Sequence, residues 1–103
     1  PEGIGEIAAC VFRSLAEKYA ATIKMLEECS SRKIESLYII GGGCQNALLN
    51  RWTAEAVEIP VYAGPVEATA IGNILVQAVS AGEVSSYSEG RRMIAENYEI
   101  IRY

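Results

Sequence analysis

The sequence predicts an α/β domain with parallel strands, and two observations support this prediction. Two short apolar runs each lead through glycine into a helical pattern, at residues 37–57 and at residues 60–81. Successive strand–turn–helix units are typical of a parallel sheet whose faces are covered by helices. A long amphipathic pattern precedes both units. The expected order is therefore helix, strand, helix, strand, helix, helix.

The first helix is predicted from residue 4 to about residue 29. Its apolar residues recur at helical spacing, and charged residues lie between them. A helix of roughly 25 residues is about 37 Å long, so its apolar stripe needs a large partner. Cys10 and Cys29 fall on this helix, and we expect them to be small buried side chains.

The first strand–turn–helix unit begins with residues 37–40, a continuous apolar run that suits a buried parallel strand. Three glycines end this strand. Helical spacing resumes at about Asn46. Residues 60–64 read as the second strand, with Pro60 at its start, where the missing N–H matters least.

A third helix is predicted from Glu67 to about Ala81, with Gly82 as its carboxy-terminal cap. Gly72 lies inside it, where glycine costs about 1 kcal/mol relative to alanine, so we expect close packing or a nearby ligand there. Ser88 is the expected cap of a short fourth helix that ends near Glu96. The remaining residues, 98–103, are able to extend as a strand.

Two strands make an inadequate sheet, because three or more are usually needed for stability. We therefore expect the chain to be a fragment, with one edge of the strand at residues 37–40 left open. An open edge is a template for another chain. We therefore expect the chain to associate with itself through this edge, which would pair the open backbone groups.

The composition excludes several functions. The formal charge of −4 argues against a nucleic-acid surface, and no apolar run is long enough to span a membrane. With no leader sequence in view, we expect a cytoplasmic protein. The chain contains no His, and all thirteen acidic residues are Glu. A Ser–His–Asp or Cys–His arrangement therefore cannot be assembled from these residues.

The residues best suited to binding are Gly41, Gly42 and Gly43, which connect a predicted strand to a predicted helix. Without Cβ atoms the backbone can approach a ligand closely, and amides at a helix start favour a polar or anionic ligand. A tight turn that binds nothing is the alternative, but three glycines at this place favour binding. Position 46 is Asn, which breaks G-x-G-x-x-G, and no Gly-Lys pair forms a P-loop.

Four runs in this region carry a wider similarity: Gly-Gly-Gly-Cys-Gln-Asn at 41–46, Leu-Leu-Asn at 48–50, Ala-Gly-Pro-Val-Glu-Ala at 63–68 and Ile-Gly-Asn-Ile at 71–74. Together they resemble the carboxy-terminal region of the FGGY carbohydrate kinases, and the first and third runs narrow the resemblance to one branch. The resemblance covers nearly the whole chain. It implies that residues 1–103 belong to the second domain of a two-domain kinase, with a partial actin-like (ribonuclease H-like) ATPase fold.

The resemblance also implies where a nucleotide would bind. ATP, together with Mg²⁺, would lie beside Gly42 and Gly43, with Asn46 facing the adenine and Gln45 a weaker candidate. From the residues alone, Asn46 is better explained as a helix cap. The catalytic Asp and the sugar site would lie in preceding sequence, so no catalytic or metal-binding residue is expected here. The substrate stays open among ketoses and polyols, including the xylulose and glycerol types, and a non-catalytic interaction module is the alternative.

Overall fold

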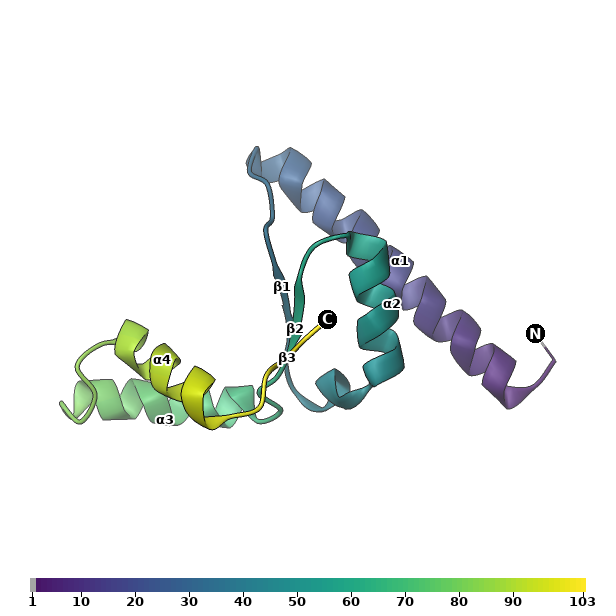
Figure 1. Ribbon diagram of the computed structural model, residues 1–103. Helices are drawn as coiled ribbons and strands as arrows, with labels where there is room; N and C mark the ends of the chain where they lie inside the picture. Colours follow the sequence, from purple (N-terminus) through teal and green to yellow (C-terminus); the bar gives the residue numbers. More distant parts are fainter. Residues whose placement is uncertain (1) are drawn as a thin grey trace.

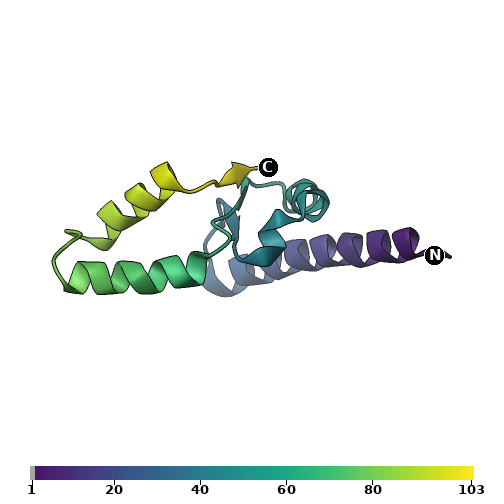
Figure 2. The ribbon, with the colours of Figure 1, turned by 90° about the horizontal axis from the view of Figure 1, so that it is seen from below.

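The computed structural model describes residues 2–103, which form a small α/β structure (Figures 1 and 2). The helices are α1 (Ile4–Ser30), α2 (Ala47–Val57), α3 (Ala68–Ser80) and α4 (Tyr87–Asn97), and η1 (Gly42–Gln45) is a short 3-10 helix. The strands are β1 (Leu37–Ile39), β2 (Val61–Ala63) and β3 (Ile101–Arg102). The predicted positions of the first three helices and of the two strands are confirmed.

The packed part of the molecule lies where α1 runs along α2 and α2 covers β2 (Figure 1). Ala16 of α1 is almost completely buried, and its small side chain lets the two helices approach closely. The guanidinium carbon of Arg13 lies 4.3 Å from the centroid of the Trp52 ring, which is a cation–π contact between α1 and α2. Val61 and Ala63 of β2 complete the small core beneath them.

The sheet has the order β1–β2–β3. β1 and β2 are parallel, as predicted, with Leu37 opposite Val61. β3 is antiparallel to β2, so the expectation of parallel strands throughout is wrong. The reason is that α3 leaves the carboxyl end of β2 and α4 returns along it, so the chain re-enters the sheet at the end it left. The expectation that residues 98–103 extend as a strand is confirmed only for Ile101–Arg102, which form β3.

α3 and α4 form a hairpin that extends away from α1 and α2 (Figures 1 and 2). Gly82 follows the end of α3 with a φ of 80°, which confirms its predicted capping role. The two helices approach closely at Gly90, where an added Cβ would lie 2.1 Å from a methyl carbon of Leu75. At Gly72, by contrast, an added Cβ would meet nothing within 4 Å, so the expected close packing is not found within this chain.

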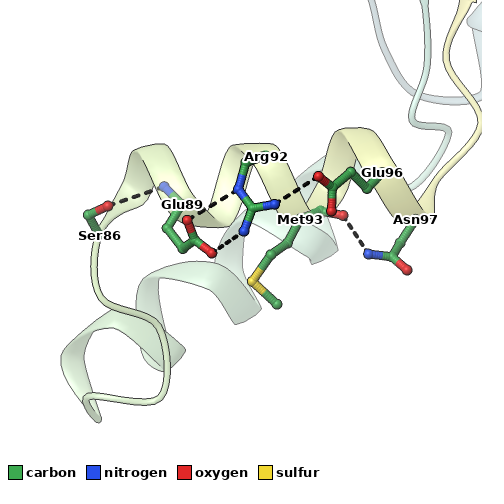
Figure 3. Close-up of polar contacts among 6 residues, drawn as sticks. All are labelled: Ser86, Glu89, Arg92, Met93, Glu96 and Asn97. Carbon is green, nitrogen blue, oxygen red and sulfur yellow. Dashed lines mark hydrogen bonds and ion pairs between the residues drawn. The ribbon is translucent and has the colours of Figure 1, made fainter.

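The cap of α4 is Ser86, not Ser88, because the Oγ of Ser86 accepts a hydrogen bond of 3.1 Å from the Glu89 amide (Figure 3). Ser86 stands three residues before Glu89, the spacing of a capping box, whereas Ser88 lies in the first turn. Further along α4, Arg92 pairs with Glu89 and Glu96 on the exposed face. The hydrogen bond from Arg92 lowers the pKa of the Glu89 carboxyl below its usual value.

The molecule is more open than a compact domain of its size. Its radius of gyration is 16.5 Å, against about 13 Å for a compact domain of this length. The ends of α1 extend beyond α2, so Ile4 is 89 % exposed and Ile7 is 50 % exposed. Cys10 and Cys29 are also exposed, so the expectation that they are buried is wrong. No helix within residues 2–103 is long and apolar enough to cross a bilayer.

Gly64, which directly follows β2, lies against the backbone of Glu99, and this contact leads to a stability prediction. Gly64 has a φ of 118°, and an added Cβ would lie 2.4 Å from the carbonyl oxygen of Glu99. We expect Gly64→Ala to lower the free energy of unfolding by about 2–4 kcal/mol, from backbone strain and steric overlap. Denaturation in urea measures this change.

The matched control for this prediction is Gly72→Ala. Gly72 lies inside α3 with open space around it, so alanine there should be neutral or should stabilise the chain by up to about 1 kcal/mol. Equal effects of the two substitutions would show that the tail residue Glu99 does not constrain Gly64.

Candidate functional site

The candidate site is the glycine turn, residues 41–46, at the carboxyl end of β1. Gly41 turns the chain out of the strand with a φ of 80°, a conformation that favours glycine. The turn continues as η1, in which the Cys44 amide donates to the Gly41 carbonyl at 3.1 Å. The Asn46 amide then donates to the Gly43 carbonyl at 3.2 Å, and α2 begins at the next residue. The sequence therefore predicted the place of this turn correctly.

A second turn lies beside the first, at the carboxyl end of β2. The Gly64 amide donates to the Ile39 carbonyl at 2.8 Å, which joins the end of β2 to the end of β1. The Gly41 amide points to the Pro65 carbonyl at 3.5 Å. The carboxyl ends of neighbouring parallel strands are where open α/β sheets bind ligands. Both turns therefore lie at the expected edge for a ligand site.

Neither backbone conformation nor packing among the described residues requires glycine at Gly42 and Gly43. Both are exposed, neither has a positive φ, and an added Cβ at either position would meet nothing within 4 Å. The three glycines thus differ: Gly41 serves the backbone conformation, whereas Gly42 and Gly43 leave backbone surface open. A group from outside the described residues can approach the main chain at these two positions.

Asn46 is the N-cap of α2. Its Oδ1 accepts a hydrogen bond of 3.0 Å from the Leu49 amide, which satisfies one of the free donors at the helix start. Within residues 2–103, its Nδ2 makes no hydrogen bond, so this donor is available to a ligand. Gln45 is exposed and precedes it in the same turn. Of the expected site residues, Gly42, Gly43, Gln45 and Asn46 are therefore brought together on one turn.

Asn50 is a residue of this site that sequence reasoning missed. Its side chain is fully buried, and its Nδ2 donates to the Cys44 carbonyl at 2.8 Å. Its position four residues after Asn46 places a polar side chain on the buried side of α2, together with Thr53. A polar residue among apolar ones at helical spacing is the sequence signal that could have indicated this buried Asn.

A cleft of about 320 Å³ runs along β1 next to the turn. Its lining comes from β1, from Tyr19 of α1 and from Leu49 of α2, and Gly43 lies at its border. The side chains of this lining are apolar or aromatic. The turn thus combines exposed backbone amides with an adjacent apolar surface, which is the usual composition of a small-molecule site.

Exposed backbone amides and the side-chain amide of Asn46 suit the turn to binding a ligand. The chain has no Asp and no His. Among residues 2–103, no three side chains of the types His, Cys, Asp and Glu come close enough to hold a metal ion. The described residues therefore supply no cluster of their own that would hold a metal ion.

Comparisons with known proteins show the class to which the chain belongs. The family model for the FGGY family of carbohydrate kinases, C-terminal domain, matches residues 1–81. The chain therefore belongs to the FGGY family, as the glycine turn and the runs around it indicated. α4 and β3 lie beyond the matched residues.

The branch of the family is indicated by individual relatives, which are rhamnulokinases. The chain is 43 % identical to the rhamnulokinase of Halalkalibacterium halodurans over 103 residues, and 46 % identical to that of Bacteroides thetaiotaomicron over 103 residues. It is 44 % identical to that of Bacillus subtilis over 100 residues. These matches cover 97 to 100 % of the chain but only 21 or 22 % of each relative. The chain thus spans about a fifth of the length of these relatives.

Proposed function

We propose that this chain is the carboxy-terminal part of a kinase that transfers the γ-phosphoryl group of ATP to L-rhamnulose. Its own contribution is one wall of the nucleotide site, formed by Gly42, Gly43, Gln45 and Asn46. Membership of the FGGY family supports the kinase class, and the names of the relatives support the sugar. Another ketose or a polyol is the alternative substrate within the family.

The observation that carries this proposal is the open backbone at Gly42 and Gly43. Packing within the chain does not require glycine at either position, since an added Cβ would meet no atom. A ligand that approaches the main chain would require it. Exposed amides at the start of a helix suit the phosphates or the ribose of a nucleotide. The free Nδ2 of Asn46 would extend the same site with a hydrogen-bond donor toward the base.

The composition of the chain indicates which steps of the kinase reaction its residues would serve. Phosphoryl transfer requires a base for the attacking hydroxyl and Mg²⁺ on the phosphates. With no Asp in the chain and no cluster that could hold a metal among residues 2–103, both requirements fall to other parts of the kinase. Our proposal therefore assigns ATP binding, and no chemical step, to these residues.

The test is a graded series of variants in the full-length kinase. We expect Gly43→Val to weaken ATP binding by about 10- to 100-fold, because the branched side chain would occupy the space of the ligand. Asn46→Ser keeps an oxygen that caps α2 but removes Nδ2, so it should weaken ATP binding by only about 2- to 10-fold. Isothermal titration with a non-hydrolysable ATP analogue measures both changes.

The control is sugar affinity measured without nucleotide, which should stay the same in both variants. Unchanged ATP affinity in Gly43→Val would remove the glycine turn from the nucleotide site. Unchanged affinity in Asn46→Ser alone would leave Asn46 with its cap role only.

A further inference from the structure

We propose that Asn50 is a positioning residue that holds the glycine turn from inside the protein, acting through the carbonyl of Cys44. The proposal rests on the proposed nucleotide role of the turn, and it adds the residue that fixes the turn's shape. Asn50 does not face the open backbone of Gly42 and Gly43. Its role is to keep the chain that carries them in one conformation.

The geometry places Asn50 directly behind the turn. Its Nδ2 donates to the Cys44 carbonyl at 2.8 Å, and Cys44 is itself only 6 % exposed. Because both partners are buried, water is a poor substitute for this hydrogen bond. Asn50 belongs to α2, a regular helix, so the anchor of the turn stands on a rigid element.

The middle of the turn has few other constraints. Its start is tied by the hydrogen bond from the Cys44 amide to Gly41, and its end by the bond from the Asn46 amide to Gly43. Both of these bonds lie within the turn itself. Two further contacts hold the ends of the turn, since the Gly41 amide points to the Pro65 carbonyl at 3.5 Å and the Asn46 Oδ1 accepts from the Leu49 amide at 3.0 Å. Asn50 supplies the side-chain contact to the middle of the turn, at Cys44.

The choice of Asn at a fully buried position has no other explanation in the structure. Its Oδ1 is buried and has no hydrogen-bond partner among the described residues, which is unfavourable. A leucine of similar size would fill the space without that cost. The bond to Cys44 is the interaction that a leucine would lose, so we infer that this bond is the reason for Asn50.

The first experiment measures the turn itself by hydrogen exchange in the full-length kinase without nucleotide. In Asn50→Leu, we expect the amides of Cys44 and Asn46 to exchange at least about tenfold faster than in the unchanged protein. Thr53→Val is the matched control, because Thr53 is equally buried on α2 and, among residues 2–103, its hydroxyl donates only to the Leu49 carbonyl within the helix. It should leave those two amides unchanged. Equal exchange in Asn50→Leu and Thr53→Val would overturn the proposal.

The second experiment uses Asn50→Asp, which keeps the size of the side chain. An ionised carboxylate cannot donate to the Cys44 carbonyl, whereas a protonated carboxyl can, and burial raises the pKa of such a group. ATP affinity of Asn50→Asp, relative to the unchanged protein, should therefore recover as the pH falls below neutral. The same ratio for Asn50→Leu should not depend on pH. Identical pH profiles for the two variants would overturn the role of the hydrogen bond.

The two proposals fail in different ways. If Gly43→Val weakens ATP binding while Asn50→Leu changes neither ATP affinity nor exchange at Cys44, Asn50 is not a positioning residue and the nucleotide site stands. If Asn50→Leu speeds exchange at Cys44 while neither variant changes ATP affinity, Asn50 does position the turn. In that case the turn has no part in binding ATP.

Discussion

The purified 103-residue chain should show no ATP-dependent phosphorylation of L-rhamnulose above the blank. The chain has neither Asp nor His, so no group matches the base that would accept the proton of the attacking hydroxyl. General-base catalysis alone contributes about 10²- to 10⁴-fold, and binding of the sugar would be lost as well. A coupled assay for ADP, confirmed by phosphorus NMR of the product, measures the activity.

The control for this result is the full-length kinase, assayed at the same molar concentration. A small contamination by the full-length enzyme would imitate activity, so the chain should be purified from cells that lack the gene for that enzyme. Kinase activity that co-purifies with the 103-residue chain through several columns would contradict the proposal that the chain only binds ATP. Its acidic residues, all Glu, would then have to include a catalytic group.

The isolated chain should also associate with itself, with β1 as the central contact. Its accessible surface is 7325 Å², whereas a compact monomer of this mass exposes about 5,700 Å². The excess of about 1,600 Å² per chain is about twice the roughly 800 Å² that each partner buries in a standard protein–protein interface. A sheet edge adds directional hydrogen bonds to this apolar surface, so we expect pairing of two β1 strands.

The free edge of β1 can be assigned to particular atoms. The Leu37 amide donates to the Pro60 carbonyl at 3.0 Å, and the Ile39 carbonyl accepts from Gly64, so these residues face β2. In a parallel ladder the intervening residue faces the other way, so the N–H and C=O of Tyr38 point to the open edge. The cleft along β1 would receive side chains of the added strand.

Two substitutions at Tyr38 test this interface. Both Tyr38→Pro and Tyr38→Ala remove the ring that stacks on Tyr62, with centroids 5.0 Å apart, but only proline removes the N–H at the open edge. We expect Tyr38→Pro to weaken the dimer at least about fivefold more than Tyr38→Ala, the scale of one or two lost hydrogen bonds. Sedimentation velocity across a wide concentration series measures the dissociation constant. A chain that stays monomeric throughout would show that its three strands need no further partner.

Much of the fold could be predicted because it depends on local patterns. The helical period of α1 and the apolar runs of β1 and β2 each reflect which faces are buried, and they were located to within two residues. The glycine turn and the cap by Asn46 follow from backbone chemistry at known places in such a unit. Family membership followed from the same short runs, because those runs contain the turns.

What only the tertiary structure decided depends on residues far apart in the sequence. The direction of β3 follows from the α3–α4 hairpin, and the requirement for glycine at position 64 follows from the carbonyl of Glu99 lying next to it. The exposure of Cys10 depends on which part of α1 other elements cover, which periodicity cannot measure. Asn50 reads as an ordinary polar helix residue until the fold places its amide under the Cys44 carbonyl. A periodic pattern shows which face of an element is apolar, but the partner that covers this face is set by packing between distant segments.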